Sequence, residues 1–126
     1  MKKILFICKG NVFRSRMAEA IFNSRAPDGW IAESAGIDPW PTIAKHTVSA
    51  MSEIGLSIGT RKARKINDQI VKSADKIVVF QNAIRDHFNF DYLVWTVSDC
   101  TQDDAECIYR GRDDIIKLVD GLIESL

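Results

Sequence analysis

The stretch "KILFICKGNVFRSRMAEAIF", residues 3–22, predicts how the chain begins to fold. Residues 3–8 are rich in Ile, Leu and Phe without polar alternation, which is the pattern of a strand buried on both faces of a parallel sheet. After a Gly-Asn loop, apolar residues recur at helical spacing from Met17 to Ile21. A strand, a loop and a helix in this order predict the first unit of an α/β fold.

The rest of the chain repeats this alternation of strand and helix. The predicted strands are 30–37, 75–80 and 91–97. Helices are predicted at 42–54, 81–90 and 103–126. A further segment begins as a basic loop at residue 60 and is predicted to become helical near Asn67. The fold class that follows is α/β, a three-layer structure with a four-stranded parallel sheet and helices on both faces.

Length and composition limit the classes of function. The 126 residues fit a single domain, 1–126, and the 17 basic and 17 acidic residues cancel, so we expect no binding of nucleic acid or membranes. No apolar run approaches the roughly 20 residues of a membrane span. Three cysteines, an odd number, predict free thiols in a reducing compartment. We expect a cytoplasmic protein that is a monomer or weak dimer.

The loop from Cys8 to Ser15 has the composition of an oxyanion site. It follows a predicted parallel strand, where ligands of open α/β sheets collect. Its backbone N–H groups and the dipole of the next helix attract an anion, and Arg14 supplies a bidentate guanidinium. The same positive features favour the thiolate of Cys8, and Ser15 can donate a hydrogen bond to the sulfur. Cys8 is therefore the predicted nucleophile toward a bound phosphate.

Other residues are predicted to shape the site around that nucleophile. Gly10 allows close approach of the backbone to a ligand, and Asn11 tolerates left-handed geometry and can brace the loop with its amide. Phe13 and Trp40 are candidate aromatic walls, although Phe13 can instead pack in the core and Trp40 cover a turn. The predicted substrate-binding residues are Lys9, Gly10, Asn11, Val12, Phe13 and Trp40.

The stretch "CKGNVFRSRMAEAIF" (8–22) resembles the phosphate-binding loop and first helix of the low-molecular-weight protein tyrosine phosphatases. Segments similar to the family continue at 34–36, 55–57 and 74–80, so the resemblance covers most of the chain. Arsenate reductases of the thioredoxin-coupled type share this fold. The resemblance implies a four-stranded parallel sheet, no metal and no cofactor.

The resemblance also implies roles for individual residues. Cys8 is the expected nucleophile, Arg14 the transition-state clamp, and an aspartate on a late loop the general acid. That loop reads "VSDCTQDD" here, which makes Asp99 the candidate, although the proline that usually follows it is replaced by Cys100. The competitors Asp103 and Asp104 are expected in the first turn of the last helix instead.

The expected function is hydrolysis of phosphate monoesters, on a phosphotyrosine protein or an aryl phosphate, through a phosphocysteine intermediate. The substrate is thus expected to be a phosphorylated protein or a small phosphate ester. Val12 favours an oxygen ester, since relatives acting on phosphoarginine typically place threonine there. Arg16 replaces a proline common in the family, and Arg16 and Lys9 are expected to be solvated side chains at the mouth rather than a polyanion site.

Two alternatives remain open. An arsenate reductase needs two further thiols, which the resemblance places near Gln81 and Phe88, where this chain has none. Cys100 and Cys107 are seven residues apart, which on one continuous helix separates them by about 10 Å, beyond the roughly 7 Å of a disulfide. Only a loop around Cys100 would bring them together.

The second alternative is a phosphate-binding or signalling module without catalysis. The presence of a nucleophile, a clamp and a candidate general acid in one chain argues against that class.

Overall fold

The computed structural model describes residues 1–59 and 61–126. Residue 60, the first of the predicted basic loop, lies outside the described residues. The elements in chain order are β1 (Lys2–Cys8), α1 (Arg14–Ser24), β2 (Trp30–Gly36), α2 (Lys45–Glu53), α3 (Asp68–Ser73), β3 (Lys76–Phe80), the 3₁₀ helix η1 (Gln81–Ala83), β4 (Leu93–Trp95) and α4 (Ala105–Glu124).

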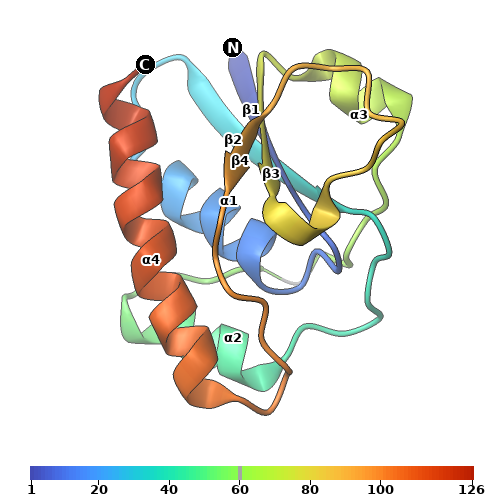
Figure 1. Cartoon of the computed structure of the whole chain (residues 1–126). Helices are drawn as coiled ribbons and strands as arrows, with labels where there is room; N and C mark the ends of the chain where they lie inside the picture. The colour runs from blue at the N-terminus through green and yellow to red at the C-terminus, as the bar shows by residue number, and fades with distance from the viewer. Residues whose placement is uncertain (60) are drawn as a thin grey trace.

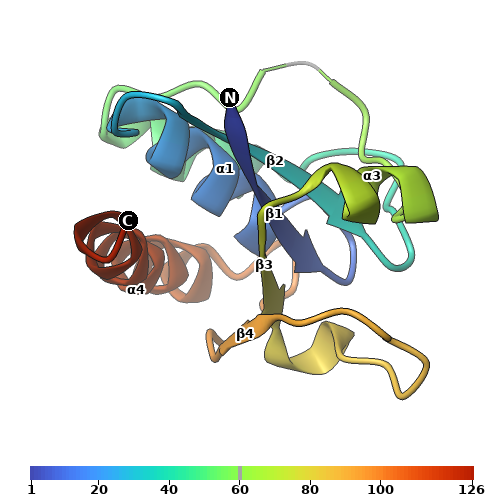
Figure 2. The same cartoon turned by 90° about the horizontal axis from the view of Figure 1, so that it is seen from above.

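Four parallel strands form one sheet in the order β2-β1-β3-β4 (Figure 1). β1 lies at the centre and pairs with β2 along its whole length and with β3 from Ile4 to Ile7. Seen from above, α1 and α4 lie on one side of the sheet, and α3 and η1 lie on the other (Figure 2). The predicted α/β class, with a four-stranded parallel sheet between two helical layers, is confirmed.

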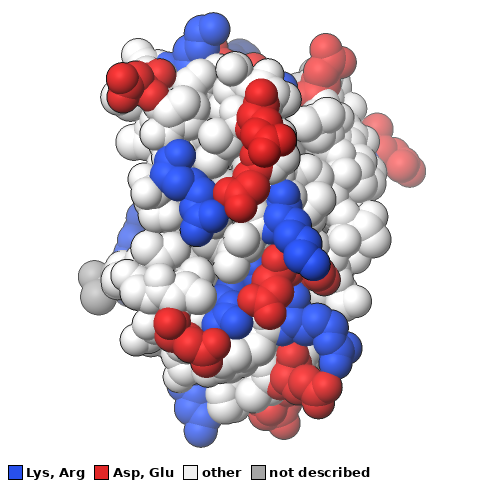
Figure 3. Space-filling view, turned by 90° about the vertical axis from the view of Figure 1, so that its left-hand side faces the viewer, with Lys and Arg blue, Asp and Glu red and all other residues white. Residues whose placement is uncertain are grey.

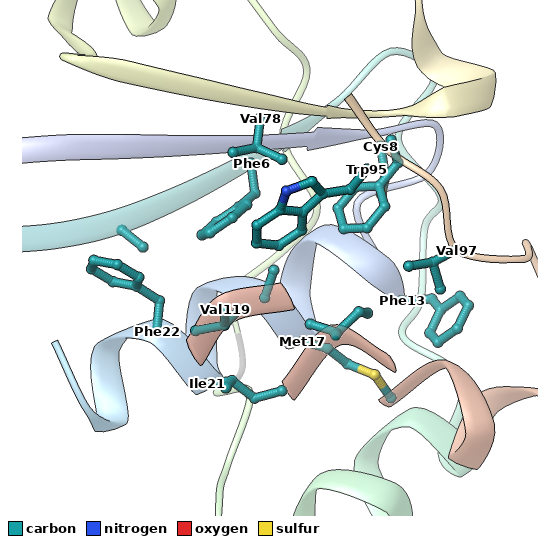
Figure 4. Close-up of a cluster of buried hydrophobic side chains, with 14 of the residues drawn as sticks. Phe6, Cys8, Phe13, Met17, Ile21, Phe22, Val78, Trp95, Val97 and Val119 are labelled. Atoms are coloured by element: carbon teal, nitrogen blue, oxygen red, sulfur yellow. The ribbon is translucent and has the colours of Figure 1, made fainter. Parts of the chain in front are cut away.

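The alternation of side chains along β1 divides the core into two parts. Ile4 and Phe6 point into the larger part, between the sheet and α1, α2 and α4. There the ring of Phe6 packs against Phe22 of α1 and Trp95 of β4, with ring centroids 6.3 and 5.4 Å apart (Figure 4). Because these residues lie on three different elements, the cluster fixes α1 against both the centre and the edge of the sheet.

The smaller part of the core lies on the opposite face. Leu5 and Ile7 of β1 point into it, and it is covered by α3 and by the chain between β3 and β4. Three aromatic rings of that connection, Phe88, Phe90 and Tyr92, pack against one another. β1 is therefore buried on both faces, as its unbroken apolar run predicts.

Several predicted elements were too long, among them the helix predicted at 42–54, which is α2 at Lys45–Glu53. The helix predicted at 81–90 is only the three-residue η1, because the backbone becomes extended at Ile84, with φ −66° and ψ 137°. The strand predicted at 91–97 is confined to Leu93–Trp95, at the edge of the sheet. The last helix begins at Ala105 rather than 103, since the carboxylate of Asp104 caps it by accepting from the N–H of Cys107 at 3.1 Å.

Charges of both signs are interleaved on the face that carries α4 (Figure 3). Among the described residues, none of the helices combines the length and apolarity required to cross a bilayer. Within the same residues, His, Cys, Asp and Glu side chains do not gather into a group that could hold a metal ion.

Two glycines of α4 make a matched test of how this helix packs. A Cβ on Gly111 would lie 2.7 Å from Cζ of Phe13, whereas a Cβ on Gly121 would meet nothing within 4 Å. Gly121→Ala is therefore expected to raise the free energy of unfolding by about 0.5–1 kcal/mol, because alanine is the better helix former. Gly111→Ala is expected to lower it by about 1–3 kcal/mol through overpacking. Urea denaturation followed by circular dichroism measures both free energies. An equal increase in both variants would contradict the close contact between Gly111 and Phe13.

Candidate active site

The site lies where the path of the chain changes direction in the sheet. From β1 the chain crosses to β2 on one side, and from β3 it crosses to β4 on the other. The loops that leave β1 at Cys8 and β3 at Phe80 therefore diverge, and ligands of doubly wound sheets bind in the crevice between such loops. The predicted oxyanion loop occupies this crevice.

Cys8 is buried at the end of β1, with 3% of its surface exposed. Its Sγ lies 2.9 Å from the hydroxyl oxygen of Ser15 and accepts from the backbone N–H of Asn11 at 3.3 Å. Both groups lie where they can donate a hydrogen bond to the sulfur of the predicted nucleophile. Of the three cysteines, Cys8 is the one with a free thiol.

Asn11 directs the hydroxyl of Ser15 toward that sulfur. Its φ of 55° is left-handed, as predicted, and its Oδ1 accepts from the backbone N–H of Arg64 at 3.0 Å, which fixes the orientation of the amide. Its Nδ2 then donates to the oxygens of Ser15 and Ser34, both at 2.9 Å. Because the oxygen of Ser15 already accepts this bond, its proton is free to point at Cys8.

The same contacts correct one prediction about Asn11. Its side chain is fully buried and does not line the cavity over the loop, because its amide is engaged with three neighbours on the inner side of the loop. Its side chain thus braces the loop rather than contacting a substrate.

Arg14 is buried, with 1% of its side chain exposed, and three hydrogen-bond acceptors besides the carboxylate of Asp99 hold its guanidinium. Its Nη1 donates to the carbonyl of Val97 at 3.2 Å and to Oε1 of Gln81 at 3.4 Å. Its Nη2 donates to Oδ1 of Asn82 at 2.6 Å. The sequence did not predict that Gln81 and Asn82 of η1 contact Arg14. The one indication in the sequence is that these two polar residues directly follow the buried strand β3.

Asp99 lies at the rim of the same cavity. Its Oδ2 is 3.5 Å from Nη2 of Arg14 and accepts from Nδ2 of Asn82 at 3.1 Å, while 47% of its side chain stays exposed. Its competitors lie elsewhere: Asp104 caps α4, and Asp103 does not line the cavity. Of the three carboxylates considered, Asp99 is the one that the fold brings to Arg14.

A cavity of about 270 Å³ opens above the loop. Lys9 is exposed at its mouth, and the indole of Trp40, 49% exposed, forms part of its wall. Gly10 lies under this indole, since a Cβ there would come within 2.6 Å of Cδ1 of Trp40. The lining residues of the cavity are Cys8, Lys9, Gly10, Val12, Phe13, Arg14, Trp40, Ala44, Thr47, Asp99, Cys100, Thr101, Gln102 and Ile108.

Phe13 combines the two roles that its sequence position left open. It lines the cavity, yet it is 7% exposed and packs against Gly111 of α4. Val12 also lines the cavity and is mostly buried. The apolar floor of the cavity is thus continuous with the larger core.

Arg16 is not the solvated rim residue that the sequence predicts. Its side chain is 2% exposed, and its guanidinium donates to the carbonyls of Ile58 and Arg61, each at 2.8 Å. Burial lowers the pKa of this guanidinium below its usual value, and the neighbouring charge of Arg61 lowers it further. The first turn of α1 directs Arg16 toward the carbonyls of Ile58 and Arg61, where it binds the backbone instead of meeting a ligand.

The cysteines after β4 also differ from the prediction of three free thiols. Cys100 and Cys107 form a disulfide with their Cα atoms 5.8 Å apart. The pair does not lie on one helix, because α4 begins only at Ala105 and Cys100 lies in the preceding loop. The disulfide therefore ties the residue after Asp99 to the first turn of α4, and Cys100 forms part of the cavity wall.

Comparison with known proteins identifies the family. The family model described as low molecular weight phosphotyrosine protein phosphatase matches residues 3–96. An arsenate reductase of Halalkalibacterium halodurans is 31% identical, and the match covers 98% of this chain and 96% of that protein. Arsenate reductase 1 of Staphylococcus epidermidis is 32% identical over 71% of this chain and 76% of its own length.

Solved structures show the same architecture. A low molecular weight protein tyrosine phosphatase from T. tengcongensis superposes with a TM-score of 0.86 at 26% identity, and each chain is covered completely. An arginine phosphatase from Geobacillus stearothermophilus has a TM-score of 0.88 at 21% identity, with 99% of this chain and 92% of that chain covered, and shares the fold. The chain belongs to the low molecular weight phosphotyrosine protein phosphatase family.

Proposed function

We propose that this protein is a phosphatase that hydrolyses phosphate monoesters through a phosphocysteine on Cys8. The observation that carries the proposal is the placement of Asp99 beside Arg14, at the rim of the cavity whose floor holds the Cys8 sulfur. A nucleophile below an oxyanion and a proton donor above it are what an in-line displacement at phosphorus requires.

In the first step, Sγ of Cys8 attacks phosphorus and the bond to the leaving oxygen breaks. Asp99, in its protonated form, gives its proton to that oxygen, so the product leaves as a neutral alcohol or phenol. The N–H groups of the loop and the guanidinium of Arg14 hold the phosphoryl oxygens, whose charge is spread over them in the transition state.

In the second step, a water attacks phosphorus and the sulfur–phosphorus bond breaks. Asp99, now a carboxylate, takes the proton from that water. The hydroxyl of Ser15, already aimed at Sγ, stabilises the thiolate as it leaves. Inorganic phosphate is released, and the thiolate of Cys8 and the protonated Asp99 are both restored.

The cavity favours an aromatic leaving group. Its volume of about 270 Å³ and the half-exposed indole of Trp40 suit a planar ring that stacks beside the loop. Aryl phosphates and phosphotyrosine in a protein chain are the proposed substrate class. Lys9, exposed at the mouth, lies where it can meet an acidic group next to the phosphorylated residue.

Arsenate reduction is the second candidate, favoured by the disulfide beside the cavity and by relatives named arsenate reductase. Cys8 would form a sulfur–arsenic bond with loss of water. Cys100 or Cys107, reduced, would then attack the Cys8 sulfur, so that the electron pair of the sulfur–arsenic bond passes to arsenic and arsenite leaves. The third thiol would resolve this mixed disulfide into Cys100–Cys107, which a dithiol reductant would reduce.

The side chain at position 81 supports the phosphatase function over arsenate reduction. The resemblance places a relay cysteine there, but this chain has an amide that exchanges two hydrogen bonds with the backbone of Val97. Gln81 thus holds the loop that carries Asp99 and has no thiol that could take part in a disulfide relay.

The first test of the phosphatase is hydrolysis of an aryl phosphate such as p-nitrophenyl phosphate in the presence of a chelator. Wild type is expected to be active, and Cys8→Ser is expected to lose all measurable turnover, because a serine hydroxyl is a much weaker nucleophile than a thiolate. Cys107→Ser in reductant serves as the matched control and is expected to stay active. Turnover that persists in Cys8→Ser would refute the assignment.

Asp99→Asn tests the general acid and separates an enzyme from a binding module. Its turnover of esters with poor leaving groups is expected to fall by about 10²–10³, since an amide cannot donate a proton to the leaving oxygen. Asp103→Asn, a carboxylate of the same loop outside the cavity, is the control and is expected to keep wild-type rates. Equal rates in Asp99→Asn and wild type would exclude Asp99 from the reaction.

The arsenate assay decides between the two enzymatic candidates. With thioredoxin as reductant, arsenite is expected to form no faster than in a sample of Cys8→Ser, because the relay position near Gln81 has no thiol. Arsenite formation that requires Cys8, Cys100 and Cys107 together would reverse the order of the two candidates.

A further inference from the structure

We infer that Asn82 is a positioning residue that holds Asp99 over the reacting group in both of its protonation states. The inference rests on the phosphatase function proposed above. It starts from a side chain that contacts both the clamp and the general acid: Oδ1 of Asn82 accepts from Nη2 of Arg14 at 2.6 Å, and Nδ2 donates to Oδ2 of Asp99 at 3.1 Å.

These two bonds determine which way the amide of Asn82 faces. A guanidinium only donates and a carboxylate only accepts, so the oxygen must face Arg14 and the nitrogen must face Asp99. The amide carries its acceptor and its donor on one rigid plane. The amide therefore sets the distance between the two catalytic groups.

Gln81 prepares the loop on which Asp99 lies. The last pair in the β3–β4 ladder is Phe80 with Trp95, and beyond it the amide of Gln81 continues the pairing. Its Nε2 donates to the carbonyl of Val97 at 2.9 Å, and its Oε1 accepts from the N–H of the same residue at 3.2 Å. The backbone is thus fixed two residues before Asp99, and Asn82 fixes the carboxyl group itself.

The bond from Asn82 matters because the ion pair with Arg14 cannot hold Asp99 during the first step. To act as an acid, Asp99 must be neutral, and Arg14 must face the phosphoryl oxygens. The ionic attraction between them is then lost. Apart from Asn82, the remaining polar contact of the Asp99 carboxyl group among the described residues is the N–H of Cys100, which donates to Oδ1 at 3.0 Å. An N–H of Asn82 still bonds to a carboxyl oxygen whether or not the group is ionised.

A double-mutant cycle tests this inference. Asn82→Ala, Asp99→Asn and the double variant are compared with wild type on a series of aryl phosphates with good and poor leaving groups. Asn89→Ala, an exposed asparagine in the same connection between β3 and β4, is the control. Asn82→Ala is expected to lower kcat roughly tenfold for poor leaving groups and about twofold for good ones, because only the former need the proton.

The decisive measurement is the turnover of the double variant compared with that of Asp99→Asn. If Asn82 acts through Asp99, adding Asn82→Ala to Asp99→Asn costs no further rate on poor leaving groups. Equal slowing of all substrates, or a loss that adds fully to that of Asp99→Asn, would show a merely structural role and overturn the inference. Wild-type inactivity toward every ester would instead overturn the proposed function, and with it this inference, so the two failures are distinguishable.

Discussion

The parallel pairing of β1 with β3 is the constraint on which the site depends. It places the end of β1 beside the end of β3, although Cys8 and Gln81 are more than seventy residues apart in the chain. The oxyanion loop and the two amides of η1 then face each other across one crevice. Burial of β1 on both faces fixes this register, because a slip of one residue would exchange its two sets of core side chains.

A buried arginine shows how the fold prepares the site before a substrate arrives. An isolated charge in the interior is costly, and Arg14 is therefore surrounded by a backbone carbonyl, two amide oxygens and a carboxylate. These partners hold the guanidinium in one orientation, so the proposed binding of a phosphoryl group would need little reorganisation. Arg14 also lies over the ring of Phe80, with its Cζ 5.3 Å from the centroid, which connects this guanidinium to the core.

The sequence predicted those parts of the site that follow from local pattern. The strand, the loop and the helix from residue 3 to 22 carry Cys8, Arg14 and Ser15 in one short segment, and the backbone geometry of Asn11 follows from its residue type. The burial of Arg16, the disulfide after Asp99 and the amide of Asn82 could not be predicted, because each depends on a segment that only the tertiary fold brings near. The family model also ends at residue 96, so the placement of Asp99 rests on this structure.

In the proposed reaction, Cys8 carries the phosphoryl group during turnover. Rapid quench of the protein with an aryl phosphate, followed by peptide mass spectrometry under conditions that preserve sulfur–phosphorus bonds, tests it most directly. The structure predicts phosphate on the peptide that contains Cys8 within the first turnover, and none on that peptide in Cys8→Ser. Steady hydrolysis with no phosphate on Cys8, or with phosphate on another residue, would contradict the account.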